Sequence, residues 1–423
     1  MFNENSKKIL FIIGFVIVVL IIGFFVYNLF WRPVFVGPSP EIKSTSTPSS
    51  GLPGSTAGKG QVVAPGGPGG LPGEENKTQE DLSPAESQPI AEKPSETAVG
   101  GLTATKEIFS TPTLGATLGQ NGNGLQFYNK NDGKFYKINK DGQTELLSDK
   151  TFYNIEKVTW SPNKNKAVLE YPDGANTIYD FSANKQITLP AHWEDYDFSP
   201  DGSKLVMKSM GQEESNRWLA ITNDDGSRAT PIEEMGDKDN EVYPLWSPNN
   251  QSIALFTSGV DFNRQEVFFV GLNKENFKST IVEGRGFQPK WSPDGERLAY
   301  SVYSSDTGMN PNLWIVNGKG DTIGSGRKNL YVATWANKCT FANDTELYCG
   351  VPVNLDENSG LFPDLAKDKP DELYKIDTLT GLKTLIAVPD GNFNMINPAI
   401  DASGNYIYFT DANTGKILQV KLK

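Results

Sequence analysis

Histidine is almost missing from this chain of 423 residues, because His192 is the only one. Sites that use several histidines, whether to hold a metal or to relay protons, are therefore excluded. Cysteine is also scarce, and the pair Cys339 and Cys349 allows one disulfide at most. Positive charge is in deficit, with 39 Lys and Arg against 51 Asp and Glu and a formal net charge of −12. A nucleic-acid partner needs clustered positive charge, so we expect none.

Motifs of common enzyme sites are missing as well. Neither the phosphate-binding loop G-x-x-x-x-G-K-[ST] nor the nucleophile elbow G-x-S-x-G occurs. His192 could serve as a general base with Glu194 or Asp195, but a structural or surface histidine is the favoured interpretation. The loop 237–241 is rich in oxygen ligands, yet a solvated acidic loop is favoured. We therefore expect a protein that is not an enzyme, with no catalytic residue, metal or cofactor.

A long apolar run lies near the start of the chain. Residues 9–31 read ILFIIGFVIVVLIIGFFVYNLFW and carry no charge. An apolar helix of ~20 residues spans the ~30 Å hydrocarbon layer, and no small-residue cleavage site follows the run. Lys7 and Lys8 precede it and Arg32 follows it, so the positive-inside rule places residues 1–8 in the cytoplasm. We expect a single-pass signal-anchor helix in the lipid bilayer of the cell membrane, with the rest of the chain extracytoplasmic.

Residues 32–102 change in composition and are dominated by Pro, Gly, Ser, Thr, Glu and Lys. Such a segment cannot bury enough apolar surface to offset the entropy of ordering it. We expect a disordered linker that holds the following domain away from the bilayer.

From residue 103 to residue 423, short aromatic and β-branched runs alternate with turn residues, which predicts an all-β domain. One pattern recurs in it: a large apolar residue followed by Ser-Pro-Asp-Gly or Ser-Pro-Asn. The apolar residues are Trp160, Phe198, Trp246 and Trp291, with degenerate copies at Phe341 and Ile400, and neighbouring copies lie 38 to 59 residues apart. A second Gly turn follows in phase, so that each unit holds four strands. Four-stranded units at a period of ~40–45 residues are typical of β-propeller blades.

The W-S-P-D-G turn, the apolar strand after it and the later N-D-D-G-type turn resemble the WD-like repeat of TolB-type β-propellers. The resemblance covers roughly residues 119–423 and rests on two S-P-D-G and two S-P-N copies. It implies a rigid ring that acts through protein contacts.

The repeat also predicts the number of blades. One blade precedes Trp160 and the six copies supply six more, which favours seven. Six blades is the alternative, because TolB itself is similar to a six-bladed case. The last copy ends after its third strand, and the segment around Lys106 could supply the missing outer strand and close the ring.

The two cysteines are expected to face each other across an antiparallel pair. Cys339 lies on the first strand of its blade and Cys349 on the returning strand, with the turn at Asn343 and Asp344 between them. Opposed residues lie within reach of a disulfide, and an extracytoplasmic domain permits oxidation, so a disulfide is favoured. The alternative is two buried reduced thiols.

Candidate binding residues are the aromatic residues that fall outside the repeat phase, together with His192. These aromatic residues are Trp193, Tyr243, Phe287, Trp335 and Phe393. We place them near the connections between blades, on the same face as the longer loops at 211–216, 258–264, 304–311 and 351–371. Variable loops on a rigid scaffold are where binding function tends to lie.

The favoured function is a membrane-tethered, non-catalytic module that binds a protein partner of the envelope or acts as an envelope scaffold. The alternative is a sensor for a small molecule or carbohydrate, or a hydrolytic enzyme, using the mouth of the ring. That alternative requires carboxylates to converge with at least one shifted pKa, and the candidates are Glu194, Asp195, Asp237 and Glu241.

Overall fold

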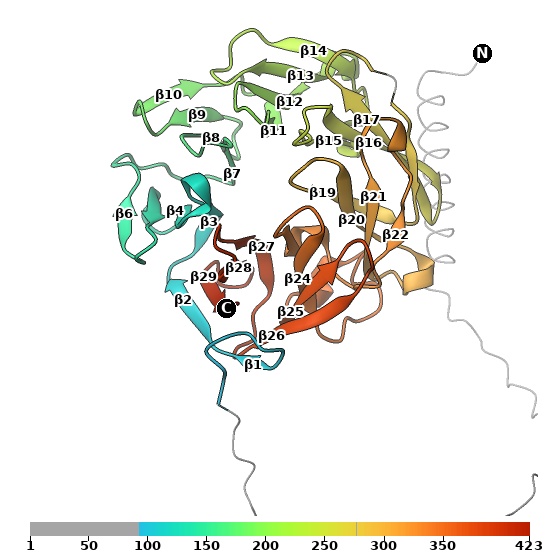
Figure 1. Ribbon diagram of the computed structural model, residues 1–423. Coiled ribbons are helices and arrows are strands. Elements are labelled where there is room, and N and C mark those ends of the chain that lie inside the picture. The colour runs from blue at the N-terminus through green and yellow to red at the C-terminus, as the bar shows by residue number, and fades with distance from the viewer. Residues whose placement is uncertain (1–92, 276) are drawn as a thin grey trace, which may run out of the picture. The chain divides into compact units, whose positions relative to one another are not determined.

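A computed structural model describes residues 93–275 and 277–423. The strands form seven separate sheets of four or five strands each. In Figure 1 the sheets stand around a ring, with β3, β7, β11, β15, β19 and β27 on its inner side and β1, β2, β6, β10 and β14 on its outer side. The fold is therefore a seven-bladed β-propeller, and the repeat correctly favoured seven blades over six.

The blades follow one another along the chain. Blade 1 contains β3 (Thr113–Leu118), β4 (Leu125–Asn129), β5 (Lys134–Ile138) and β6 (Thr144–Leu146). Blade 2 contains β7 (Lys157–Trp160), β8 (Lys166–Glu170), β9 (Thr177–Asp180) and β10 (Lys185–Thr188). Blade 3 contains β11 (Trp193–Phe198), β12 (Lys204–Met210), β13 (Arg217–Asn223) and β14 (Thr230–Glu234). Blade 4 contains β15 (Val242–Pro244), β16 (Ser252–Asp261), β17 (Arg264–Gly271) and β18 (Thr280–Val282).

The last three blades complete the ring. Blade 5 contains β19 (Arg285–Trp291), β20 (Arg297–Tyr303), β21 (Pro311–Asn317) and β22 (Lys328–Asn329). Blade 6 contains β23 (Cys339–Phe341), β24 (Glu346–Pro352), β25 (Asp371–Asp377), β26 (Lys383–Pro389) and the added parallel strand β1 (Leu102–Thr103). Blade 7 contains β27 (Met395–Ile400), β28 (Tyr406–Asp411), β29 (Ile417–Lys421) and β2 (Thr105–Phe109).

Short 3-10 turns lie in the connections. They are η1 (Gln120–Gly122), η2 (Glu214–Asn216), η3 (Asp239–Glu241), η4 (Ser305–Thr307), η5 (Gly320–Thr322), η6 (Ala336–Lys338) and η7 (Pro363–Ala366). Among the described residues no helix is long and apolar enough to cross a membrane. The predicted anchor at 9–31 and the tail at 1–8 lie outside the described residues, as does the linker up to residue 92.

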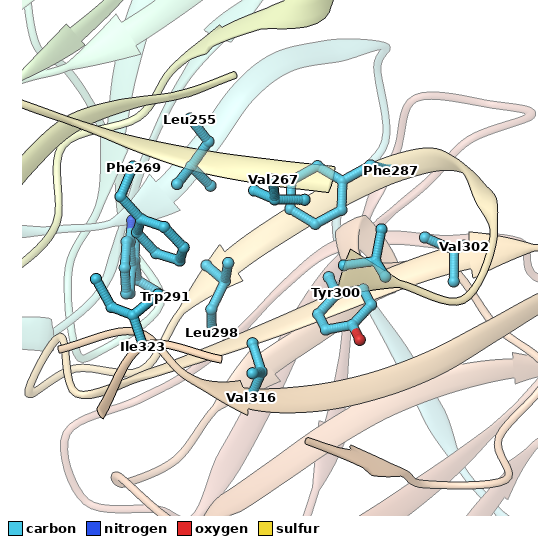
Figure 2. Close-up of a cluster of buried hydrophobic side chains, with 11 residues drawn as sticks. Leu255, Val267, Phe269, Phe287, Trp291, Leu298, Tyr300, Val302, Val316 and Ile323 are labelled. Atoms are coloured by element: carbon cyan, nitrogen blue, oxygen red, sulfur yellow. The ribbon is translucent and has the colours of Figure 1, made fainter. Parts of the chain in front are cut away.

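The core is divided among the contacts between neighbouring blades. Each of seven buried hydrophobic clusters takes its residues from two adjacent blades. Figure 2 shows the cluster between blades 4 and 5, in which Trp291 packs beside Phe269 with ring centroids 6.0 Å apart. Trp160, Phe198 and Trp246 take the same position in three other clusters. The repeated aromatic residue therefore seals one blade against the previous one, and removing it from water stabilises the ring.

The Ser-Pro turns are built alike in four blades. In blade 3 the backbone amide of Gly202 donates to the Ser199 carbonyl at 2.8 Å, and the amide of Lys204 donates to Ser199 Oγ at 2.9 Å. Gly202 has φ +71°, a conformation that glycine adopts without a steric penalty. Asn250 takes this position in blade 4 with φ 61°, and the turn is kept because asparagine tolerates the left-handed region.

The ring closes between the two ends of the described chain. β2 pairs antiparallel with β29, so residues near the start of the domain supply the outer strand of the last blade. This is the closure predicted for the segment around Lys106. Phe109 packs against Phe127 of blade 1, with ring centroids 4.5 Å apart, and thereby seals blade 7 against blade 1.

The ordered unit begins earlier than the predicted boundary at residue 103. The amide of Ala98 donates to the Lys421 carbonyl, and the amide of Gly100 donates to the Ile386 carbonyl, each at 2.9 Å. Residues 95–102, assigned by composition to the linker, therefore lie against blades 6 and 7. Backbone hydrogen bonds hold them there, and composition does not report such bonds.

Cys339 and Cys349 form a disulfide in blade 6. They are directly opposed on β23 and β24, with Cα atoms 4.0 Å apart, and both are fully buried in the cluster between blades 5 and 6. The bond therefore ties the innermost strand of blade 6 to the body of that blade.

Replacing Cys339 and Cys349 together with alanine should lower the free energy of unfolding by about 2–3 kcal/mol, because the unfolded chain gains the freedom of the opened loop. Urea unfolding in oxidising buffer measures this loss. A reductant should lower the free energy of unfolding of the wild type by a similar amount and leave that of the variant unchanged. Equal stability of the two proteins in oxidising buffer would contradict the prediction.

Candidate functional site

The connections of the propeller lie on two opposite faces. One face, the loop face, carries the loops between second and third strands and the connections between blades. The other, the turn face, carries the Ser-Pro turns and the turns between third and fourth strands. This division follows from the antiparallel order of the strands, since successive connections lie at opposite ends of a blade.

On the loop face, the loops of blades 4, 5 and 6 are joined to one another. Asn263 and Ser305 exchange two hydrogen bonds, of 2.6 and 3.0 Å, between blades 4 and 5. Between blades 5 and 6, the amide of Asn358 donates to the Gly308 carbonyl at 2.9 Å and the amide of Gly360 donates to the Met309 carbonyl at 2.8 Å. The three loops therefore form one continuous platform instead of three independent segments.

The platform exposes large apolar side chains. Phe262, at the tip of the β16–β17 hairpin, is 70% exposed and Phe362 in the blade 6 loop is 58% exposed. We define the loop-face patch as these two with the other exposed apolar residues of the same loops: Val260, Phe262, Leu361, Phe362 and Leu365. Exposed apolar groups gathered on ordered loops mark an interaction surface more often than scattered single residues do.

The loops of the platform lie in segments that the sequence predicted, but its exposed aromatic residues, Phe262 and Phe362, were not among the predicted binding residues. The sequence predicted a loop at 258–264, whereas residues up to Asp261 belong to β16 and Arg264 begins β17, so the hairpin turns at Phe262 and Asn263. A signal was available, because Phe262 and Phe362 are aromatic residues inside turn-rich segments. The search for aromatic residues near blade connections passed over them.

The candidate aromatic residues do not share one surface. Trp193 and Trp335 are each 7% exposed, and Phe393 packs against Phe409 in the cluster between blades 6 and 7. These three pack in the core instead of on the surface: Trp193 opens β11 and belongs to the cluster between blades 2 and 3. Tyr243 and Phe287 do meet, with ring centroids 5.8 Å apart, and both line one cavity of about 530 Å³.

His192 is exposed beside β11 and takes no part in a cluster of titratable groups. The Asp195 carboxylate accepts from Lys157 Nζ at 2.9 Å and from Lys208 Nζ at 2.8 Å, and these lysines hold its pKa below its usual range although burial opposes them. Glu194 and Asp237 are exposed, and the backbone carbonyl of Glu241 accepts from the Thr257 hydroxyl. In the described part of the chain no hydrogen bond joins any two of the four candidate carboxylates.

Burial raises the pKa of three described carboxylates, those of Glu170, Asp197 and Asp371. Asp197, on the innermost strand of blade 3, accepts from the backbone amide of Trp246 in blade 4 at 2.7 Å. Burial raises its pKa to about 6, and the bonds from Trp246 and Phe198 oppose that rise. Its hydrogen bonds join two blades, which makes it a structural link.

A buried ion pair lies between blades 6 and 7. Lys338 Nζ donates to Asp371 Oδ2 at 2.6 Å and to Asn394 Oδ1 at 2.5 Å. The backbone amide of Met395 donates to the same Asp371 oxygen at 2.5 Å. Burial raises the pKa of Asp371 and lowers the pKa of Lys338, because both charged forms lose water. The pair connects the loop end of blade 6 to the first strand of blade 7.

Within residues 93–275 and 277–423, no group of three or more His, Cys, Asp or Glu side chains is placed to hold a metal ion.

Comparison with known proteins identifies the fold. No protein-family model matches the chain, and no curated protein matches it. An oligogalacturonate lyase solved in complex with manganese is similar over 75% of this chain and 93% of its own, with TM-score 0.50 and 13% identity. The Cps50 (Swd1) propeller domain of Myceliophteria thermophila is similar over 75% of this chain and 100% of its own, with TM-score 0.49 and 11% identity. A gluconolactonase of Xanthomonas campestris covers 75% with TM-score 0.41 and 10% identity. At 13% identity the likeness to the lyase concerns the fold alone, and it agrees with the seven sheets, which make residues 105–423 a β-propeller.

Proposed function

We propose that this protein is a non-catalytic binding module, in which the propeller presents its loop-face patch to a protein partner of the cell envelope. The observation that carries the proposal is the patch itself: five exposed apolar side chains on loops that hydrogen bonds join into one platform. Binding surfaces gain most of their affinity from a few such side chains when a partner removes them from water. The resemblance to TolB-type propellers, which act through protein contacts, supports the same conclusion.

The proposal includes a membrane tether. Residues 9–31 form an uncharged apolar run long enough to span a bilayer, and Lys7 and Lys8 before it favour a cytoplasmic amino terminus. The disulfide between Cys339 and Cys349 supports an oxidising, extracytoplasmic location for the propeller. Protease added to intact cells should then cleave the propeller domain, and deletion of residues 9–31 should release the protein from the membrane fraction.

The binding test is crosslinking in intact membranes followed by purification of the protein. Changing the five residues of the loop-face patch to serine should lower recovery of the partner at least tenfold, because a few buried contacts carry most of the binding energy and the loss of one of them costs about 2 kcal/mol or more. This substitution leaves Asp371 in place, whereas deletion of the whole loop 351–371 would remove the partner of the buried Lys338.

The matched control changes Leu379 and Leu382 to serine. They are 54% and 66% exposed and lie in the turn between β25 and β26, on the turn face of blade 6. The control variant should recover as much partner as the wild type. Equal recovery from wild type, control and patch variant would contradict the assignment of the loop face.

A further inference from the structure

The cavity that contains Tyr243 and Phe287 lies at the centre of the ring. Its lining comes from the first strands of three blades, β15, β19 and β27, and from η6, which leads into the first strand of a fourth. First strands of four blades come together only around the axis of a propeller. The volume of about 530 Å³ falls within the range of small-molecule sites, and residues on four separate elements hold its shape.

The walls of the cavity combine aromatic surface with polar groups that have no protein partner. Tyr243 and Phe287 meet edge to face on one side. Lys290, Asn337 and Asn397 also line the cavity, and in the described part of the chain their side chains make no hydrogen bond or ion pair. Gln288 Oε1 is buried without a partner.

Lys290 differs from Lys157, Lys208 and Lys338, three lysines that have carboxylate partners. Lys157 and Lys208 are paired with Asp195, and Lys338 is paired with Asp371. No described carboxylate oxygen lies within ion-pair distance of Lys290 Nζ, although the whole chain carries a net charge of −12. A partly buried ammonium group without a counter-ion is costly, and an anion that enters the cavity would remove that cost.

We propose that this cavity binds a small organic anion, whose carboxylate or phosphate oxygen is held by Lys290 and whose remaining part lies against Tyr243, with the buried Phe287 ring supporting Tyr243 from behind. The amides of Asn337 and Asn397 would supply hydrogen bonds to its polar groups. The cavity shares no residue with the loop-face patch. A negative result for one proposal therefore leaves the other unaffected.

The site should depend on pH through Lys290. Burial lowers the pKa of its ammonium group to about 8, from an ordinary value of 10.5. The charged form that holds an anion is therefore present below pH 8 and lost as the pH rises above it. Tyr243 is the only other titratable residue in the lining, and burial raises its pKa, so it stays neutral over this window.

Thermal unfolding of the full chain in detergent tests the proposal, with benzoate and inorganic phosphate as separate probes. At pH 7 at least one probe should raise the midpoint by about 2–4 °C, and the gain should disappear at pH 9. A response to benzoate alone would indicate a carboxylate ligand and a response to phosphate alone a phosphate ligand. Sodium chloride at equal ionic strength and the neutral analogue benzamide control for salt and for partition into detergent.

Two variants distinguish binding at Lys290 from stabilisation that does not depend on this residue. Lys290→Met should abolish the gain, while Lys185→Met removes an equal charge from exposed β10 and should keep it. As a measurement that needs no variant, reductive methylation with ¹³C-formaldehyde should reveal one lysine signal titrating near pH 8 that shifts when the probe is added. An equal gain in Lys290→Met, or no response to either probe in both measurements, would overturn the proposal.

Discussion

Replacing Thr105–Phe109 with Gly-Pro-Gly-Pro-Gly is expected to open the propeller, the largest effect of any local change considered for this chain. These residues form β2, the outer strand of blade 7, and proline cannot donate the hydrogen bonds that pair β2 with β29. The variant also loses Ile108 and Phe109 from the cluster between blades 7 and 1. Together these losses amount to about 5 kcal/mol or more, comparable with the whole stability of many domains.

The exposed edge of β29 would then be open to pairing with another molecule. Thermal unfolding should show a midpoint at least about 10 °C lower, and size-exclusion chromatography should show higher oligomers. The same replacement at residues 60–64, in the predicted linker, is the control and should change neither measurement. If the variant at residues 105–109 had the same thermal midpoint as the control variant, the stability of the ring would not depend on β2.

Removing one member of the buried ion pair is expected to have the second largest effect. Lys338→Met leaves Asp371 as a buried carboxylate without its counter-charge, and Asp371→Leu leaves Lys338 in the same condition. Their side chains are 6% and 0% exposed, so water cannot replace the lost partner. Each single change should lower the free energy of unfolding by about 3–5 kcal/mol, as measured by urea denaturation.

The double variant Lys338→Met/Asp371→Leu provides the decisive comparison. It removes both charges, so a large part of the lost stability should return, although Asn394 and the Met395 amide lose their partner. If the losses from the two single changes simply added in the double variant, the two side chains would not act as a pair. The surface pair of Lys137 and Glu145 is the control, and breaking it should leave the urea midpoint almost unchanged, because both side chains already lie in water.

Several features of the fold could be predicted because they depend on local chemistry that repeats. The Ser-Pro turns need only Ser, Pro and a residue that tolerates positive φ within a few positions, and the aromatic residue before each turn has one place to pack. Four of these turns, two degenerate copies and one blade before the first copy together predicted seven blades. The incomplete last copy predicted closure by the segment around Lys106, because a blade that lacks its outer strand leaves an unpaired edge.

The same reasoning failed for individual side chains. Trp193 and Tyr243 occupy similar positions at the start of their blades and both pack between blades, yet Tyr243 also lines the central cavity and Trp193 does not. Position within the repeat does not predict this difference. The exposure of each side chain depends on the residues that the adjacent blade packs against it. The start of the ordered unit was also placed too late, since residues 95–102 are held by backbone groups of blades 6 and 7.

The sequence by itself determined the architecture of this protein: the all-β repeat, the number of blades and the strand that closes the ring. These follow from turn chemistry and from the pairing needs of each strand, which act over a few residues or between adjacent units. Only the tertiary structure decided where binding groups gather. Lys290, Tyr243 and Asn397 come from three blades and line one cavity, and the loops of blades 4 to 6 join into one platform, because a closed ring brings distant segments to a common axis and a common face.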